Sequence, residues 1–115
     1  MNKYGAHKTE VDNVVFDSKA ESYHYKELKL RLSAGEIKDL QLQPAYVLQS
    51  GFKRAGISYR PIIYVGDFRF TEVKTGKVVI EDVKSPATRK IASYLLKKKL
   101  LLHDLPEEIE FREVV

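Results

Sequence analysis

The fold is decided by Val78-Val79-Ile80-Glu81-Asp82-Val83-Lys84, together with the earlier run Ile62-Ile63-Tyr64-Val65-Gly66-Asp67-Phe68-Arg69-Phe70. Both runs are rich in β-branched and aromatic residues, which favour β-strands. The chain between them reads Glu72-Val73-Lys74-Thr75-Gly76-Lys77, and its Thr-Gly pair is typical of a tight hairpin turn. The sequence therefore predicts an antiparallel hairpin at the centre of the molecule.

The register of this hairpin places its charged residues. If Val73 pairs with Val78, Asp67 lies opposite Lys84. Because side chains alternate between the two faces of a strand, Asp82 points the same way as Lys84. We therefore expect two carboxylates and one ammonium group to share one face of an otherwise apolar strand pair.

Charged groups on an apolar strand pair are costly to bury and need a reason. One reason is a structural salt bridge between Lys84 and Asp67 on a face left to solvent. The other is a metal site, because Mg²⁺ is commonly held by one or two carboxylates together with water and substrate phosphate. A lysine beside such a site can position or deprotonate the attacking water, or neutralise charge on a phosphate.

The arrangement resembles the PD-(D/E)XK nuclease superfamily, in which an Asp is followed about fifteen residues later by Asp-x-Lys in a hydrophobic strand. Here the pattern reads Gly66-Asp67 and Asp82-Val83-Lys84, with Gly66 where the superfamily name has proline. Other matching stretches are Phe16-Asp17-Ser18-Lys19-Ala20-Glu21, Gln43-Pro44 and Val65-Gly66-Asp67-Phe68. In that order, over nearly the whole chain, they look like a small nuclease-like family carried by phages and prophages.

The resemblance implies a restriction-endonuclease-like fold, an α/β domain with a mixed central sheet and flanking helices, spanning residues 1–115 as a single domain. It implies a Mg²⁺- or Mn²⁺-dependent DNA endonuclease related to Holliday junction resolvases and acting on branched DNA in phage DNA metabolism. A symmetric junction would call for a homodimer. The alternatives are a single-strand or flap nuclease, an inactive DNA-binding module of the same fold, and a protein-interaction domain in which these charges form an ion-pair network.

Within that resemblance, Asp67 and Asp82 would hold the metal and Lys84 would orient the nucleophilic water. Glu21 has two readings. Ser18 is a good N-cap for a helix that continues to about Ser33 and ends at Gly35, and Glu21 has the spacing of a capping box. It also heads the helical stripe Glu21, Tyr25, Leu28 and Leu32, which should pack on the sheet. In the superfamily a Glu from the first helix often completes the acidic cluster, directly or through water.

Glu81 is the main ambiguity. The predicted register pairs it with Phe70 on the apolar face, where a Lys or Arg from an adjacent strand or from a partner subunit could neutralise it. A hairpin loop of three residues would instead place Glu81 beside Asp67 and turn Asp82 and Lys84 to the opposite face. In that case Glu81 would supply the second acid.

Composition narrows the class of protein. The chain has 115 residues, 43% hydrophobic and 31% charged, which suits one soluble domain. It has no cysteine, so disulfides and thiolate metal sites are excluded. His7, His24 and His103 lack the spacing of zinc ligands. No apolar run is long enough to cross a bilayer and no signal-peptide core is present, so we expect a cytoplasmic protein. The resemblance to a phage and prophage family implies that the cell is a bacterial host.

The positive charge is modest, a formal +4, but it is concentrated in the middle and later chain. A basic surface around carboxylates suits a polyanion that brings its phosphates to a metal. The candidate DNA contacts are Lys53, Arg54, Arg89, Lys90, Lys97 and Lys98.

The remaining elements follow from turn and helix signals. We expect loosely ordered residues 1–8, a hairpin over 9–16 turning at Asp12-Asn13, strands over 36–42 and 43–49 interrupted at Pro44, and a basic loop over 50–58. A second helix should run from Ser85-Pro86-Ala87-Thr88 to His103, with Ile91, Tyr94, Leu95, Leu101 and Leu102 on its apolar side, before a closing strand over 109–114. This order of elements predicts an α/β domain with a mixed sheet.

Overall fold

A four-stranded mixed sheet forms the centre of the computed structural model, which describes residues 8–115. Residues 1–7, part of the segment expected to be loosely ordered, lie outside the described residues. The strand order is β10 (Ile109–Val114), β9 (Val78–Val83), β8 (Phe68–Glu72) and β3 (Ile37–Leu42). β10 runs parallel to β9, whereas the other neighbours are antiparallel. The expected α/β domain with a mixed sheet is confirmed.

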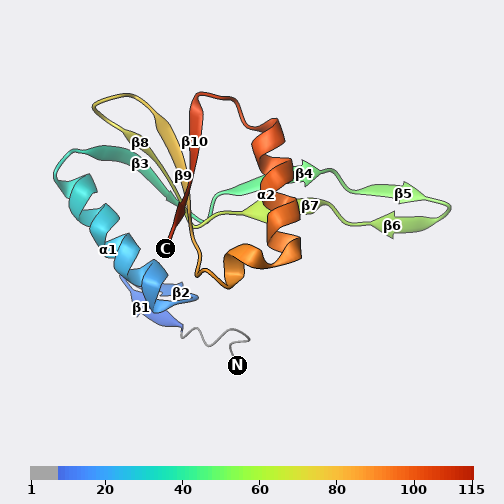
Figure 1. Ribbon diagram of the computed structural model, residues 1–115, viewed down its shortest axis with the longest axis horizontal. Coiled ribbons are helices and arrows are strands. Elements are labelled where there is room, and N and C mark those ends of the chain that lie inside the picture. Colours follow the sequence, from blue (N-terminus) through green and yellow to red (C-terminus); the bar gives the residue numbers. More distant parts are fainter. Residues whose placement is uncertain (1–7) are drawn as a thin grey trace.

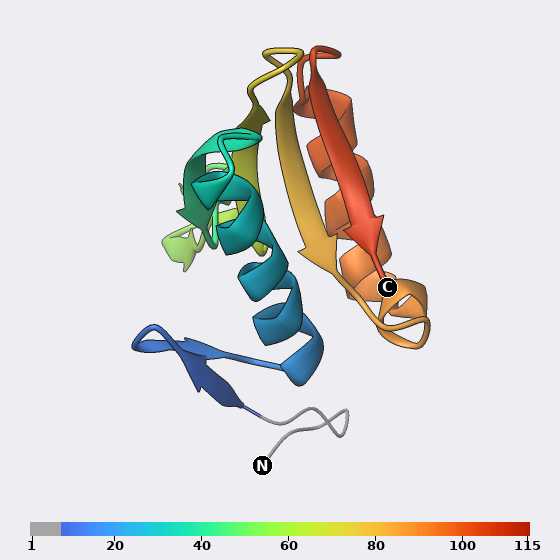
Figure 2. The ribbon, with the colours of Figure 1, turned by 90° about the vertical axis from the view of Figure 1, so that its left-hand side faces the viewer.

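The two helices lie on opposite sides of this sheet (Figures 1 and 2). On one side α1 (Lys19–Ser33) covers a core that includes Phe68, Phe70 and Val79. On the other side α2 (Ala92–Asp104) lies near β4 and β7 and contributes the buried Leu101. Strand β9 is buried along almost its whole length because it is covered on both faces. The polar side chains on β9, Glu81 and Asp82, are therefore buried as well.

The N-terminal elements form as the sequence predicts. β1 (Thr9–Val11) and β2 (Val14–Phe16) make an antiparallel hairpin around Asp12 and Asn13, whose φ angles of 52° and 63° suit a two-residue turn. Ser18 caps α1, because its Oγ accepts a hydrogen bond from the Glu21 amide at 3.1 Å. Gly35 follows the helix with a φ of 76°, the left-handed conformation that glycine adopts readily.

The central hairpin forms, but its predicted register is wrong by two residues. Phe68 pairs with Glu81 and Phe70 pairs with Val79, and the connection spans residues 73–77 instead of a tight Thr-Gly turn. Gly76 in this loop has a φ of 72°. Because a shift of two residues leaves every side chain on its predicted face, the expected grouping of Asp67 with Asp82 survives.

A long two-stranded arm leaves the sheet and protrudes from the body (Figure 1). Its base is the antiparallel pair of β4 (Ala45–Gln49) and β7 (Ile62–Val65), and its tip is the pair of β5 (Phe52–Arg54) and β6 (Ile57–Tyr59). The predicted basic loop over 50–58 is therefore wrong, because most of it forms this hairpin tip. The predicted continuous strand over 62–70 is also wrong, because it breaks at Gly66-Asp67, opposite the expected interruption at Pro44.

The second helix starts later than predicted. A short 3-10 turn, η1 (Thr88–Lys90), comes first, and Ile91 then adopts an extended ψ of 129° before α2 begins at Ala92. The predicted apolar side of this helix is only partly correct, because Leu101 is buried but Leu95 and Leu102 are exposed. Within the described residues, neither helix has the length and apolar character needed to span a bilayer.

Candidate active site

Asp67 is held beside strand β9 by main-chain contacts. It lies in the break between β7 and β8, where its amide donates to the Glu81 carbonyl at 3.1 Å. The Val83 amide donates in return to Oδ2 of Asp67 at 2.6 Å. Two hydrogen bonds thus fix the Asp67 carboxylate next to the last residues of β9, where Asp82 and Lys84 are found.

Asp82 is almost completely buried, with 1% of its surface exposed. The Tyr64 hydroxyl donates to its Oδ2. Its Oδ1 is 3.1 Å from Nζ of Lys84, an ion-pair distance, but it has no hydrogen-bond partner in the described structure. The ammonium group of Lys84 is thus the close partner of this buried oxygen, and the contact shows that the surroundings of Asp82 favour a positive charge.

The two carboxyl groups face each other, and this contact governs their protonation. Burial, followed by the hydrogen bond and the negative charge of Asp82, raises the pKa of Asp67 to about 8. Burial also raises the pKa of Tyr64 above its usual range, reinforced by its hydrogen bond to Asp82. Two adjacent carboxylates cannot both ionise without a compensating charge. The pair therefore holds a proton that a bound cation would displace.

Lys84 remains a cation in this setting. Burial lowers the pKa of Lys84, but the nearby charges of Asp82, Asp67 and Glu21 outweigh burial and leave the pKa raised. Its Nζ also lies 5.3 Å from the centre of the Tyr94 ring. The amine is thus held protonated beside the acidic pair.

A surface pocket of about 330 Å³ opens at this point. Asp82 and Lys84 lie among its lining residues, and the base of the arm (β7) and the segment from Thr88 to Lys97 form other parts of its wall. The acidic pair is therefore close to a hollow that could accept part of a ligand.

Glu21 lies near the pair without joining it. Burial and Asp17 raise the pKa of Glu21 to about 7, with smaller effects of Lys84 and Asp82. Its carboxylate accepts a hydrogen bond from the backbone of Asp17, so the expected capping contact is made one residue earlier than Ser18. Among residues 8–115 there is no ready-made group of three or more His, Cys, Asp or Glu side chains able to hold a metal. Direct ligation by Glu21 is therefore not preformed.

The six basic residues expected to contact DNA have different surroundings. Lys53 and Arg54 are exposed near the tip of the arm, and Lys97 lines the pocket. Lys98 forms an ion pair with Glu113, with 3.0 Å between Nζ and Oε1. Arg89 and Lys90 lie on η1, where Lys90 is exposed and the Arg89 Nε is buried without a hydrogen-bond partner in the described structure.

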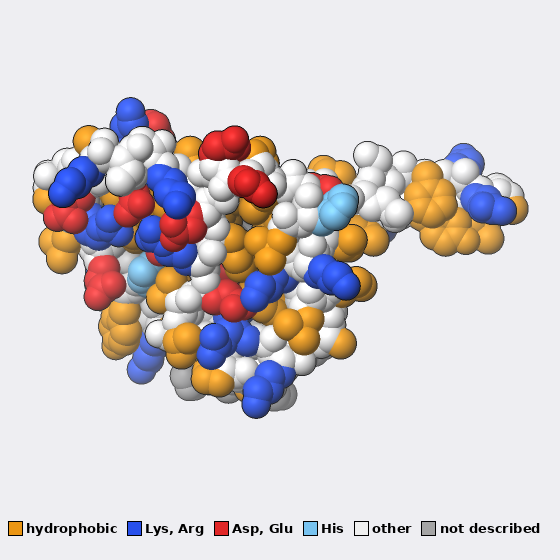
Figure 3. Space-filling view, turned by 45° about the horizontal axis from the view of Figure 1, so that its top comes forward, with side chains coloured by type: hydrophobic (Ala, Val, Ile, Leu, Met, Phe, Trp, Pro, Cys, Tyr) orange, Lys and Arg blue, Asp and Glu red, His pale blue; other side chains and the backbone are white. Residues whose placement is uncertain are grey.

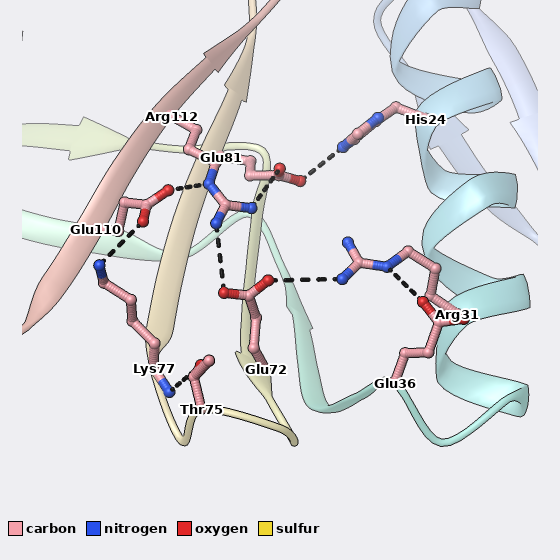
Figure 4. A network of polar contacts seen from close by, with 9 residues as sticks. All are labelled: His24, Arg31, Glu36, Glu72, Thr75, Lys77, Glu81, Glu110 and Arg112. Atoms are coloured by element: carbon pink, nitrogen blue, oxygen red, sulfur yellow. Dashed lines mark hydrogen bonds and ion pairs between the residues drawn. The ribbon is translucent and has the colours of Figure 1, made fainter.

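Glu81 points to the opposite face, so it is not the second acid of the pair. His24 on α1 bonds its Oε1 at 2.6 Å, and Arg112 on the adjacent strand β10 lies 4.0 Å from its Oε2. The expected basic partner from an adjacent strand is thus confirmed. Figure 4 shows that these contacts belong to a wider polar network between α1 and the sheet, which also includes Arg31, Glu36, Glu72, Lys77 and Glu110.

Sequence reasoning missed three residues of this region. Tyr64 and Tyr94 support Asp82 and Lys84, and His24 ties α1 to β9 through Glu81. Tyr64 and Asp82 are 18 residues apart, and His24 and Glu81 are 57 apart. The sequence offered one signal for Tyr64. Alternation along β7 places Tyr64 on the same inward face as the half-buried Ile62.

The fold and the site define an α/β protein with a buried acidic pair and a lysine at one end of its central hairpin. A family model described as a protein of unknown function (DUF1064) matches residues 1–114, and the chain belongs to that family. No curated protein and no solved structure matches the chain.

Proposed function

We propose that this protein is a divalent-metal-dependent DNA endonuclease with the restriction-endonuclease-like fold, and that it acts on branched DNA. The observation that carries the proposal is the convergence of Asp67, Asp82 and Lys84 beside one surface pocket. A structural ion-pair network would account for the contact between Lys84 and Asp82, but not for the second carboxyl group, that of Asp67, which lies against Asp82 with its pKa raised to about 8.

The residues of the site fit a hard divalent cation. All candidate donors are oxygens, and Mg²⁺ is commonly bound through one or two carboxylates, with water and substrate phosphate completing the shell. The Asp82 Oδ1 faces the ammonium group of Lys84, while the other oxygen of Asp82 is oriented by Tyr64. Hydrogen bonds of this kind orient metal ligands in proteins. Asp67 and Asp82 would therefore hold the ion, and Glu21 would reach it through water.

The protein side chains have distinct roles in this proposal. A bound Mg²⁺ or Mn²⁺ supplies Lewis-acid activation of the phosphate and of a water molecule. Lys84 keeps its proton because three carboxyl groups surround it, so it serves as a fixed positive charge. It would orient the water or stabilise the negative charge of the phosphate, and it would not act as the general base.

The substrate proposal follows from the basic surface. The candidate DNA contacts are lysines and arginines on the arm, on η1 and on α2, and such side chains bind phosphates without reading base sequence. Recognition of DNA shape through phosphate contacts is then favoured over recognition of base sequence. A four-way junction has two symmetric strands to cut, and a homodimer would supply two sites.

The direct test is a cleavage assay in Mg²⁺ and in Mn²⁺ on linear duplex, single-stranded and four-way DNA of the same sequence. We expect nicking of the junction by the wild type. Asp82→Asn should abolish cleavage, and Lys84→Gln should reduce its rate by about 100-fold or more. Asp104→Asn and Lys74→Gln change the same kinds of charge on exposed positions away from the pocket and should cleave normally.

Circular dichroism must show that each variant is folded. Undiminished cleavage by Asp82→Asn would remove the mechanism. Metal-independent binding of DNA without nicking under either ion would identify an inactive binding module. Absence of DNA binding at low salt would identify a protein-interaction domain.

A further inference from the structure

The tip of the arm is exposed on every residue from 51 to 60. Phe52 pairs with Tyr59 and Arg54 with Ile57, and the connecting residues Ala55 and Gly56 have φ angles of 50° and 77°. A two-residue turn of this kind matches the twist of the strands, so the arm is a well-defined ribbon. It has no core of its own, since none of these side chains is buried. The tip therefore contributes little to folding and needs another explanation.

An aromatic pair lies on one face of the tip. The rings of Phe52 and Tyr59 are stacked, with their centres 4.8 Å apart and their planes 12° from parallel. About half of each side chain remains exposed, 47% and 46% respectively. Alternation places Arg54 and Ile57 on the same face as the pair. The ribbon thus presents flat aromatic surface next to a cation.

The charge of the arm is of one sign. No acidic residue occurs between Asp39 and Asp67, whereas Lys53, Arg54 and Arg60 all lie near the tip. Figure 3 shows hydrophobic and basic side chains, and no acidic ones, on the visible face of the outer arm. Flat rings combined with cations are the features that bind unpaired bases and their phosphates. Two arms of the same charge would repel, which disfavours pairing of this tip with the same tip of a second copy.

The arm leads away from the candidate active site, and residues 50–51 and 60–61 join the strand pair at its base to the strand pair at its tip. Ile63, Tyr64 and Val65 at its base line the pocket that contains Asp82 and Lys84. At about 3.3 Å per residue, Tyr59 is at most about 26 Å from Asp67 along the strand. This span corresponds to up to about eight nucleotides at about 3.4 Å each. A DNA strand bound at the pocket can therefore reach the aromatic pair.

We propose that the tip of the arm, residues 52–60, binds DNA by stacking Phe52 and Tyr59 on bases with a free face, while Arg54 on the same face, Lys53 on the other face and Arg60 just past β6 contact phosphates. This inference rests on the proposed function, which names DNA as the ligand. It adds which feature of the DNA the protein would select. The arm would select bases with a free face, which are those of a single strand or those unstacked at the open centre of a junction, whereas the continuous stack of a duplex offers the rings no base face.

The test measures binding, not cleavage, by fluorescence anisotropy in EDTA with single-stranded, four-way and blunt duplex DNA. The variants are Phe52→Ala with Tyr59→Ala, and Lys53→Gln with Arg54→Gln. The matched control is Tyr23→Ala with Leu30→Ala, which removes similarly exposed side chains from α1. The aromatic variant should bind single-stranded and four-way DNA at least about tenfold more weakly and duplex nearly normally. The basic variant should weaken on all three and show a smaller salt dependence.

A second measurement uses the wild-type chain, in case the aromatic variant does not fold. The fluorescent base 2-aminopurine, placed at unpaired positions, should be quenched on binding. The proposal would be overturned if a folded aromatic variant bound all three DNAs as tightly as the wild type does. It would also be overturned if 2-aminopurine fluorescence were not quenched at any position. A change from dimer to monomer in the arm variants with unchanged DNA binding would overturn it too, because the tip would then be an interface between copies. The two proposals can fail separately. If the wild type never nicks DNA but the arm variants bind DNA more weakly than the wild type, the nuclease proposal is refuted and the proposal for the arm stands.

Discussion

Replacing His24 by Ala should destabilise the fold, because it removes the helix-side partner of the buried Glu81. Glu81 is 4% exposed, and its Oε1 is bonded to Nε2 of His24 at 2.6 Å. The remaining neighbour is Arg112, 4.0 Å from the other oxygen. Losing a hydrogen bond to a charged group costs about 1.5–3 kcal/mol. The His24 ring also packs 5.6 Å from that of Phe68, and losing this contact adds about 1 kcal/mol.

The expected total is about 2.5–4 kcal/mol, a large part of the ~5–15 kcal/mol by which a domain is stable. The melting temperature should fall by roughly 10 °C or more. Because the chain has no tryptophan, unfolding in guanidinium is best followed by far-ultraviolet circular dichroism. Glu27→Ala is the matched control, since Glu27 contacts the other side of His24 at 3.6 Å and its side chain is 75% exposed. That change should cost less than about 0.5 kcal/mol.

A double-mutant cycle separates the interaction energy between His24 and Glu81 from the contributions of their other neighbours. His24→Leu combined with Glu81→Leu removes both polar partners, and this replacement should be within about 1–2 kcal/mol of the wild type. A cost below about 1 kcal/mol for His24→Ala, or a double variant as unstable as the sum of its singles, would refute the reasoning.

Three further predictions concern the acidic pair and the strand break beside it. Because the pKa of Asp67 is raised to about 8 and that of Glu21 to about 7, the folded state holds extra protons between pH 4 and about 8, so metal-free stability should fall as pH rises through this window and be restored by Mg²⁺. Asp67→Asn should reduce this slope in thermal melts and leave the part due to Glu21. Tyr64→Phe removes the hydroxyl that orients Asp82 and should weaken Mn²⁺ binding by about tenfold in calorimetric titrations. Gly66→Ala should be tolerated within about 1 kcal/mol, whereas Gly66→Pro loses the hydrogen bond to the Pro44 carbonyl and should cost about 2–3 kcal/mol in denaturant unfolding.

Each of these has a contrary outcome. Stability that rises between pH 5 and 8 without metal would contradict the raised pKa of Asp67. Unchanged Mn²⁺ affinity in Tyr64→Phe would show that its hydroxyl does not prepare the site. Equal stability of Gly66→Ala and Gly66→Pro would mean that the hydrogen bond from the Gly66 amide to the Pro44 carbonyl is not needed.

The faces of the central hairpin could be predicted from the sequence, but its register could not. Alternation fixes which side chains share a face, and this put Asp67 with Asp82 correctly. A shift of two residues changes no face, so only the shape of the connection over 73–77 selects between registers. The α1 cap at Ser18 was predictable because its signal is local.

The arm and the start of α2 escaped prediction for different reasons. The tip around Phe52 buries nothing, so its sequence has no pattern of burial to reveal a strand. Its turn is Ala55-Gly56, which lacks the Asn-Gly signal of a two-residue hairpin. Pro86 suits a first helical turn, but the chain straightens at Ile91 before the helix begins. The partners of Asp82 and Glu81 come from distant segments, which only the packing of the fold brings together.

The central claim, that Asp67 and Asp82 together bind a divalent cation, is tested most directly by crystals grown with Mn²⁺ and measured for its anomalous scattering. The claim predicts one strong peak about 2.1 Å from a carboxylate oxygen of each residue, including Oδ1 of Asp82. A well-ordered structure at saturating Mn²⁺ with no peak between these two groups, and with Lys84 still paired to Asp82, would contradict it.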